Sequence, residues 1–146
     1  MTGKDILLVE DNPDDAELTR IAFDEAGCQH RLHLVHDGVE ALDYLFLRGR
    51  HAAREPAELP AMVLLDLNLP KLDGREVLRA MRANAATREL PVVVLTTSAE
   101  PFDVEDVYAL GADSHIQKPV EFERFVDAVR RIDACWLAVD RPAGEP

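Results

Sequence analysis

The sequence is poor in cysteine and in positive charge, and it contains no long apolar run. Its two cysteines, Cys28 and Cys135, lie far apart and have no spacing typical of a metal site or a redox pair. No apolar stretch approaches the roughly 20 residues of a membrane-spanning helix, and no secretory signal pattern follows Met1. With 16 Lys and Arg against 28 Asp and Glu, the net charge of -12 argues against a nucleic-acid surface. We therefore expect a cytoplasmic protein that binds neither membrane nor nucleic acid.

The chain has 146 residues, a length typical of one domain, and no internal repeat divides it. We expect a single domain over residues 1–146, with its core at about 5–139 and a frayed tail at 140–146. Apolar runs predict five strands, and amphipathic segments that begin at capping residues predict five helices. The expected strands are 6–9, 32–35, 62–66, 92–95 and 115–117, and the expected helices are about 13–26, 37–46, 73–81, 103–110 and 121–139.

Strands that alternate with helices, without a hairpin signal, indicate a parallel sheet with right-handed crossovers and helices on both faces. The strongest apolar runs are the first, third and fourth, and the doubly wound order 2-1-3-4-5 makes those strands central. The sequence thus predicts an α/β fold with a five-stranded, doubly wound parallel sheet. The residues expected to face the core are Leu18, Ile21, Ala22 and Ala26 on the first helix and Phe122, Phe125, Val126, Val129 and Ile132 on the last.

Polar residues follow or end four of the predicted strands: Glu10 and Asp11 at the first, Asp66 at the third, Thr96 at the fourth and Lys118 at the fifth. The carboxyl ends of the strands are the usual ligand site of an open α/β sheet. Three carboxylates close together repel one another unless a hard cation such as Mg²⁺ neutralises them. A cation, a hydroxyl and an ammonium around Asp66 would suit phosphoryl transfer to that carboxylate. Taken singly, each residue could instead be a strand-end cap or a counter-ion.

Four motifs resemble those of the receiver domain of two-component response regulators. They are LVEDN at 8–12, LDLNLP at 65–70, LTTS at 95–98 and KP at 118–119. The resemblance covers about residues 5–132, and the motifs are specific only in combination. It implies a signalling protein rather than an enzyme, in which Asp66 accepts a phosphoryl group from a sensor histidine kinase.

The resemblance also implies a set of ligands for Mg²⁺. Asp11 and Asp66 would bind the cation directly, and Glu10 would contribute through water. The backbone carbonyl of Asn68 would complete the ligands that the protein supplies.

Two further residues take roles from the resemblance, and one position departs from it. Thr96 would hydrogen-bond a phosphoryl oxygen after transfer, and Lys118 would pair first with Asp66 and then with the phosphoryl group. The peptide bond between Lys118 and Pro119 is expected to be cis, as is usual in the family.

The family usually has Tyr or Phe three residues before the lysine, where the ring turns inward as the threonine moves, but here that residue is His115. A histidine gains less from burial, so His115 is either an altered switch residue or an exposed residue of an edge strand.

Three features resemble the stand-alone regulators that partner phytochrome-type sensor kinases. No output domain follows the last helix, the loop at 48–59 is long for a helix-to-strand connection, and Thr97 follows Thr96. The resemblance therefore implies a histidine kinase of the phytochrome type as partner.

The end of the last predicted helix is apolar on nearly all sides, with Trp136 and Leu137 at its centre. A helix over 121–139 would be roughly 28 Å long, against about 17 Å for a five-residue strand, so its end would overhang the sheet. We expect this apolar end to pack in a homodimer. The alternative is that it folds back over its own domain, onto the loop at 48–59.

Two other functions fit parts of the pattern. A Mg²⁺-dependent phosphatase of the haloacid-dehalogenase type also uses a strand-end Asp, but it needs a second Asp two residues later, where this chain has Asn68. A flavodoxin-like or nucleotide-binding module needs a phosphate-binding loop after the first strand, where Glu10 and Asp11 would repel phosphate.

Overall fold

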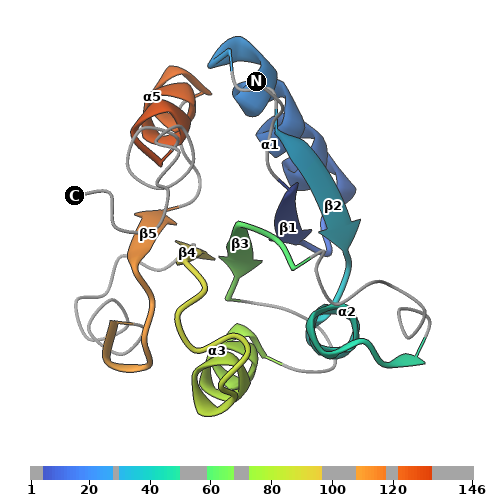
Figure 1. The fold of residues 1–146 in the computed structure, drawn as a ribbon. Coiled ribbons are helices and arrows are strands. Elements are labelled where there is room, and N and C mark those ends of the chain that lie inside the picture. The colour runs from blue at the N-terminus through green and yellow to red at the C-terminus, as the bar shows by residue number, and fades with distance from the viewer. Residues whose placement is uncertain are drawn as a thin grey trace.

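The structure is a computed structural model, and a five-stranded parallel sheet forms its centre (Figure 1). The structure describes residues 5–27, 30–49, 59–67, 73–96, 108–117 and 122–132, with only the backbone for Thr96, Gln117 and Ile132. The strand order is β2-β1-β3-β4-β5, as predicted. The strands are β1 (Asp5–Val9), β2 (Arg31–Val35), β3 (Met62–Asp66), β4 (Val92–Thr96) and β5 (Ser114–Gln117).

Helices cover both faces of this sheet. They are α1 (Pro13–Glu25), α2 (Gly38–Phe46), α3 (Gly74–Ala83) and α5 (Phe122–Ile132). Helices α1 and α5 lie together on one face, and α2 and α3 lie together on the other (Figure 1). Most of the helix expected at 103–110 lies outside the described residues, although Tyr108 and Ala109 are helical. The expected continuation of the last helix to residue 139 also lies outside them.

Capping residues start three of the helices where the sequence predicts. The Asn12 side chain accepts hydrogen bonds from the N–H groups of Asp14 and Asp15 at 2.8 and 3.2 Å, and Pro13 occupies the first helical position of α1. Asp37 accepts from the N–H of Glu40, and Asp73 accepts from the N–H of Arg75. Helix α1 therefore begins within a few residues of the end of β1, which holds Glu10 and Asp11 between two regular elements.

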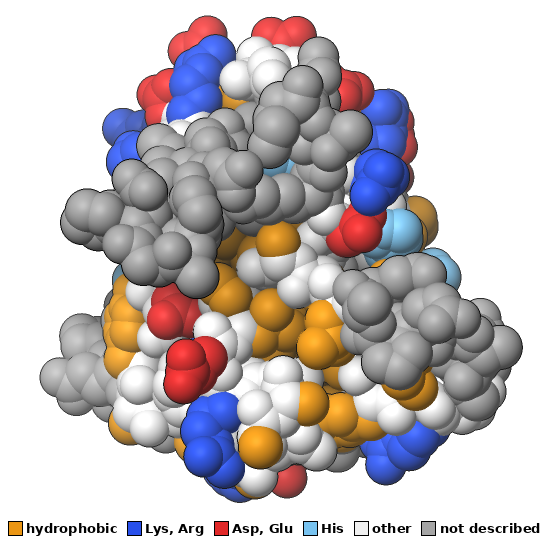
Figure 2. All heavy atoms as spheres, in the orientation of Figure 1, with side chains coloured by type: hydrophobic (Ala, Val, Ile, Leu, Met, Phe, Trp, Pro, Cys, Tyr) orange, Lys and Arg blue, Asp and Glu red, His pale blue; other side chains and the backbone are white. Residues whose placement is uncertain are grey.

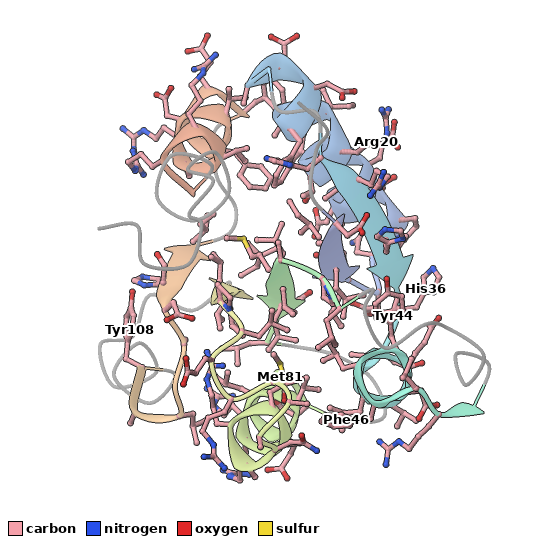
Figure 3. The ribbon with its side chains drawn as sticks, in the orientation of Figure 1. Arg20, His36, Tyr44, Phe46, Met81 and Tyr108 are labelled. Atoms are coloured by element: carbon pink, nitrogen blue, oxygen red, sulfur yellow. The ribbon has the colours of Figure 1, made fainter. Side chains whose placement is uncertain are left out.

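The sheet separates two apolar clusters because successive residues of each strand face opposite sides. Leu7 and Val63 belong to the cluster beneath α2 and α3, which also contains Met81, drawn between α3 and the sheet in Figure 3. Ile6 and Leu64 belong to the cluster beneath α1 and α5. All five residues of β3 are buried, so the strand that ends in Asp66 is the centre of both clusters.

The prediction for the buried face of α1 is wrong at one position. Ile21 is 38% exposed, whereas Phe23 is buried against the sheet. Thr19 is buried as well, and its hydroxyl donates to the backbone oxygen of Asp15 at 2.9 Å, which satisfies its polar atom. Thr19 and Phe23 are therefore the buried residues of this part of α1, and Ile21 is exposed to solvent. On α5, the predicted residues Phe125, Val126 and Val129 are buried.

The described surface carries both signs of charge. On the face in Figure 2, acidic and basic side chains are interspersed rather than gathered into one field. Within the described ranges, every helix is too short or too polar to cross a bilayer.

Candidate functional site

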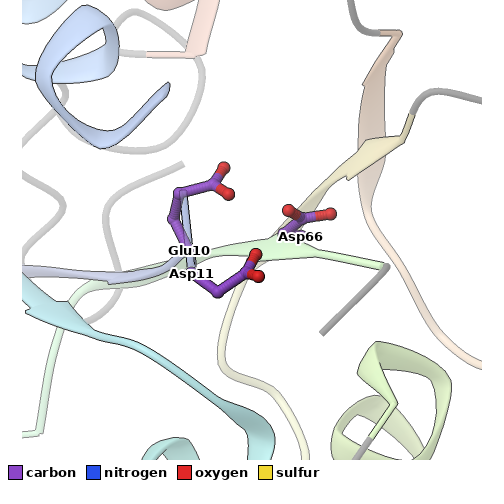
Figure 4. A group of neighbouring side chains, drawn as sticks. All are labelled: Glu10, Asp11 and Asp66. Atoms are coloured by element: carbon purple, nitrogen blue, oxygen red, sulfur yellow. The ribbon is translucent and has the colours of Figure 1, made fainter. Parts of the chain in front are cut away.

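Three carboxylates meet at the carboxyl ends of β1 and β3. Glu10 and Asp11 directly follow β1, and Asp66 is the last residue of β3. One carboxylate oxygen of each residue lies within 4.8 Å of the others. Figure 4 shows the three side chains converging from the two strands. This is the acidic group that the sequence predicts.

The register of the sheet explains this convergence. Val9 of β1 is paired with Leu65 of β3, so the residues that follow each of them are neighbours at the sheet edge. The N–H of Glu10 donates to the backbone oxygen of Val35 at 3.0 Å, and the N–H of Leu67 donates to that of Leu95 at 3.0 Å. Backbone hydrogen bonds to the flanking strands therefore fix the chain on both sides of the acidic group.

The three carboxylates differ in their exposure. Glu10 and Asp66 are only 1% and 5% exposed, whereas Asp11 is exposed. A Glu10 oxygen accepts a hydrogen bond from the N–H of Asn12 at 3.2 Å, just before the start of α1. The positive end of the α1 dipole lies on this side of the group and offsets part of the negative charge. The arrangement thus holds two buried carboxylates beside one that solvent reaches.

The donor set of this site fits a hard divalent cation. Carboxylate oxygens are the ligands that Mg²⁺, Mn²⁺ and Ca²⁺ prefer, and three of them within 4.8 Å of one another can reach one ion. A cation at this position would lower the repulsion among the three carboxylates.

The other predicted site residues are placed only in part. Thr96 ends β4 beside β3, where Leu95 is paired with Asp66, so its backbone lies at the same edge of the sheet. Gln117 of β5 is paired with Thr96, and Lys118 follows it in the sequence. Lys118, with Pro119 and Asn68, lies outside the described residues, and so do the predicted dimer residues Trp136 and Leu137.

His115 lies on β5 and has a partner that sequence reasoning missed. The hydroxyl oxygen of Tyr108 lies 2.9 Å from Nδ1 of His115, and the two rings meet edge to face with centroids 5.5 Å apart. Tyr108 is 42% exposed and lies at the rim of the molecule beside β5 (Figure 3). No sequence pattern links these two residues, because the segment between them includes a turn at Gly111 whose φ is 111°.

Comparisons with known proteins agree with this geometry. Residues 6–130 match the response regulator receiver domain family. The probable methanogenesis regulatory protein FilR2 of Methanothrix harundinacea is 43% identical over 142 residues, which cover 95% of this chain and 87% of that protein. Response regulator Rcp1 of Synechocystis sp. is 37% identical over 134 residues, which cover 92% of this chain and 89% of that protein.

Solved structures have the same fold. The Mn²⁺-bound form of Rcp1 superposes with a TM-score of 0.82 at 37% identity, over 96% of this chain and 99% of that one. The phosphorylated cyanobacterial phytochrome response regulator RcpA gives a TM-score of 0.81 at 37% identity, over 92% of this chain and 94% of that one.

Proposed function

The chain belongs to the response regulator receiver domain family, and we propose that Asp66 is the residue through which it accepts a phosphoryl group. As a receiver domain it takes that group from a histidine kinase and acts in signalling, not as an enzyme with turnover. The observation that carries the proposal is the position of Asp66. It is nearly buried at the end of the central strand, with its carboxylate within 4.8 Å of those of Glu10 and Asp11.

Receiver domains bind a divalent cation at an acidic pocket, and we propose that this one binds Mg²⁺. Asp11 and Asp66 would be direct ligands, Glu10 would act through water, and the backbone carbonyl of Asn68 would complete the set. The all-oxygen donor set supports this assignment, as does the Mn²⁺-bound structure of the relative Rcp1. When bound, the cation offsets the charge of the phosphoryl oxygens.

The proposed transfer uses the chain's own residues in separate roles. A carboxylate oxygen of Asp66 forms a bond to phosphorus while the bond between phosphorus and the donor's imidazole nitrogen breaks. The Thr96 hydroxyl then donates a hydrogen bond to one phosphoryl oxygen. The ammonium of Lys118 pairs with another phosphoryl oxygen. The peptide bond from Lys118 to Pro119 is proposed to be cis.

The output of phosphorylation is proposed to pass through β4 and β5. Thr96 and His115 lie on these adjacent strands, whose register pairs Thr96 with Gln117. A movement of Thr96 toward the phosphoryl group would therefore act on β5. Because His115 contacts Tyr108, a movement of His115 on phosphorylation would also involve Tyr108.

The proposed partners are a phytochrome-type histidine kinase and a second copy of the chain. The relation to RcpA, which is a phytochrome response regulator, supports the first. The apolar segment around Trp136 and Leu137 supports the second. The phosphatase of haloacid-dehalogenase type has no support among the family matches.

One experiment distinguishes a phosphoacceptor protein from a phosphatase. Wild-type protein is incubated with a small acyl phosphate and Mg²⁺, and its intact mass is measured. We expect the gain of one phosphoryl group per chain. In parallel, a generic phosphate ester should show no sustained hydrolysis. The absence of any mass gain, or steady turnover of the ester, would contradict the proposal.

A further inference from the structure

Gly74, the first residue of α3, lies against the backbone that follows Asp66. Its N–H donates to the backbone oxygen of Leu67 at 3.0 Å. A Cβ atom at this position would lie 2.6 Å from the backbone oxygen of Asp66, 2.8 Å from Cα of Leu67 and 3.1 Å from the backbone oxygen of Leu67. All three atoms belong to the backbone, so a side-chain movement cannot relieve the overlap. Only glycine permits this approach.

Neither side of this contact is free to move. Helix α3 is held by Val77, Leu78 and Met81, which are completely buried in the cluster beneath it. On the other side, the N–H of Leu67 donates to the backbone oxygen of Leu95, which ties the end of β3 to β4. The peptide between Asp66 and Leu67 is therefore clamped between α3 and β4. A change at Gly74 must displace either the helix start or the end of the strand that bears Asp66.

We propose that Gly74 is a positioning residue, which sets the distance of the Asp66 carboxylate from those of Glu10 and Asp11 and thereby favours Mg²⁺. This inference rests on the proposed cation site. Its physical basis is that Mg²⁺ demands near-ideal octahedral geometry with ligands at about 2.0–2.1 Å, whereas Ca²⁺ accepts irregular geometry at about 2.3–2.6 Å. A shift of a few tenths of an ångström at Asp66 therefore penalises Mg²⁺ more than Ca²⁺.

The test compares Mg²⁺ and Ca²⁺ affinities of wild type and Gly74→Ala, read from amide resonances in NMR titrations. We expect Gly74→Ala to weaken Mg²⁺ binding by about tenfold, the lower end of the usual effect of disturbing groups that orient metal ligands. Ca²⁺ binding should weaken by a smaller factor, so that the ratio of the two affinities changes. An unchanged ratio would overturn the inference, because a merely structural role of Gly74 would alter both affinities alike.

Val129→Ala on α5 is the control for a general loss of stability. Val129 is completely buried in the cluster on the opposite face of the sheet from α3, so this variant should lower the unfolding temperature and leave both affinities as in wild type. If Val129→Ala changes the ratio of affinities as much as Gly74→Ala does, the special role of Gly74 is refuted.

A second measurement decides the matter if Gly74→Ala does not fold. In wild type, Mg²⁺ should slow hydrogen exchange of the Gly74 amide and leave that of Arg82, at the other end of α3, unchanged. Equal exchange at Gly74 with and without Mg²⁺ would refute the inference. Phosphoryl labelling of wild type is a separate readout, so the proposed function can fail or succeed independently of this result.

Discussion

Three acidic residues of similar chemistry have different surroundings in this site. Glu10 and Asp66 are buried at the ends of adjacent strands, while Asp11 is exposed. A buried carboxylate can be held in a fixed position by its neighbours, whereas an exposed one can exchange between water and a cation. Burial therefore does not by itself assign the proposed roles, because the buried Asp66 and the exposed Asp11 are both proposed as direct ligands of the cation.

Asp11→Asn should weaken Mg²⁺ binding by about tenfold or more, because it removes the charge of a proposed direct ligand. Asp14→Asn is the matched control, since Asp14 is an exposed carboxylate in the first turn of α1 and outside the acidic group. Titration with Mg²⁺ followed by NMR measures both. If the two variants weaken binding equally, general negative charge rather than a ligand set attracts the cation.

Asp5 should make stability depend on pH in the acid range. Arg31 donates to its carboxylate at 2.6 Å and His33 lies at 3.0 Å, and the hydrogen bond from Arg31 holds the pKa of Asp5 below its ordinary value of 3.8. A folded-state pKa below the unfolded one contributes stability that is complete above about pH 4 and is lost as the pH falls through the lowered value. Asp5→Asn should therefore be less stable than wild type at pH 7, by up to about 1 kcal/mol.

The difference in the free energy of unfolding between wild type and Asp5→Asn should shrink as the pH falls below 3.8, the ordinary pKa of the Asp5 carboxyl. Urea unfolding of both proteins from neutral to acid pH measures it. A difference that stays constant over the whole range would show that the ionised carboxylate of Asp5 contributes nothing.

At the level of elements, β4 and β5 are the proposed route from phosphorylation to output. Thr96→Ala should still be phosphorylated, yet it should lose the conformational response, because its hydroxyl is needed only after the phosphoryl group arrives. His115→Tyr should strengthen the response if this position is used as a switch. Hydrogen exchange of β4 and β5, with and without acyl phosphate, measures these effects. If acyl phosphate changes this hydrogen exchange identically in wild type and in both variants, β4 and β5 do not carry the output of phosphorylation through Thr96 and His115.

The strands and helix starts were predictable because each depends on local sequence. The run that ends in Asp66 is apolar on both faces of the sheet, and α1, α2 and α3 begin after the capping residues Asn12, Asp37 and Asp73, close to the expected helix starts. Parallel pairing then forces the strand ends to one edge of the sheet. For this reason the grouping of Glu10, Asp11 and Asp66 follows from the sequence pattern alone.

The features that sequence reasoning missed depend on packing between elements. Whether Ile21 or Phe23 faces the core depends on the space between α1 and the sheet, and periodicity alone allows either residue to do so. The contact between Tyr108 and His115 depends on the geometry of an intervening turn. The close approach of Gly74 to Asp66 depends on where α3 lies against β3, which the sequence of α3 does not encode locally.

At the scale of the whole molecule, the apolar segment that follows α5 in the sequence bears on the oligomeric state. We predict a homodimer that the double variant Trp136→Asp, Leu137→Asp weakens, because two buried charges would be costly at an apolar contact. Light scattering at tens of micromolar measures the mass of each protein. A monomeric wild type would end this hypothesis, as would a double variant that dimerises equally well.

Asp66 itself is proposed to carry the phosphoryl group. Borohydride reduces an aspartyl phosphate to homoserine, so peptide mass mapping after reduction locates the modified residue. Wild type treated with acyl phosphate and Mg²⁺ should contain homoserine at position 66, and Asp66→Asn should contain none, because a neutral amide is not a competent nucleophile. Homoserine at position 11 in wild type, or undiminished labelling of Asp66→Asn, would contradict the account.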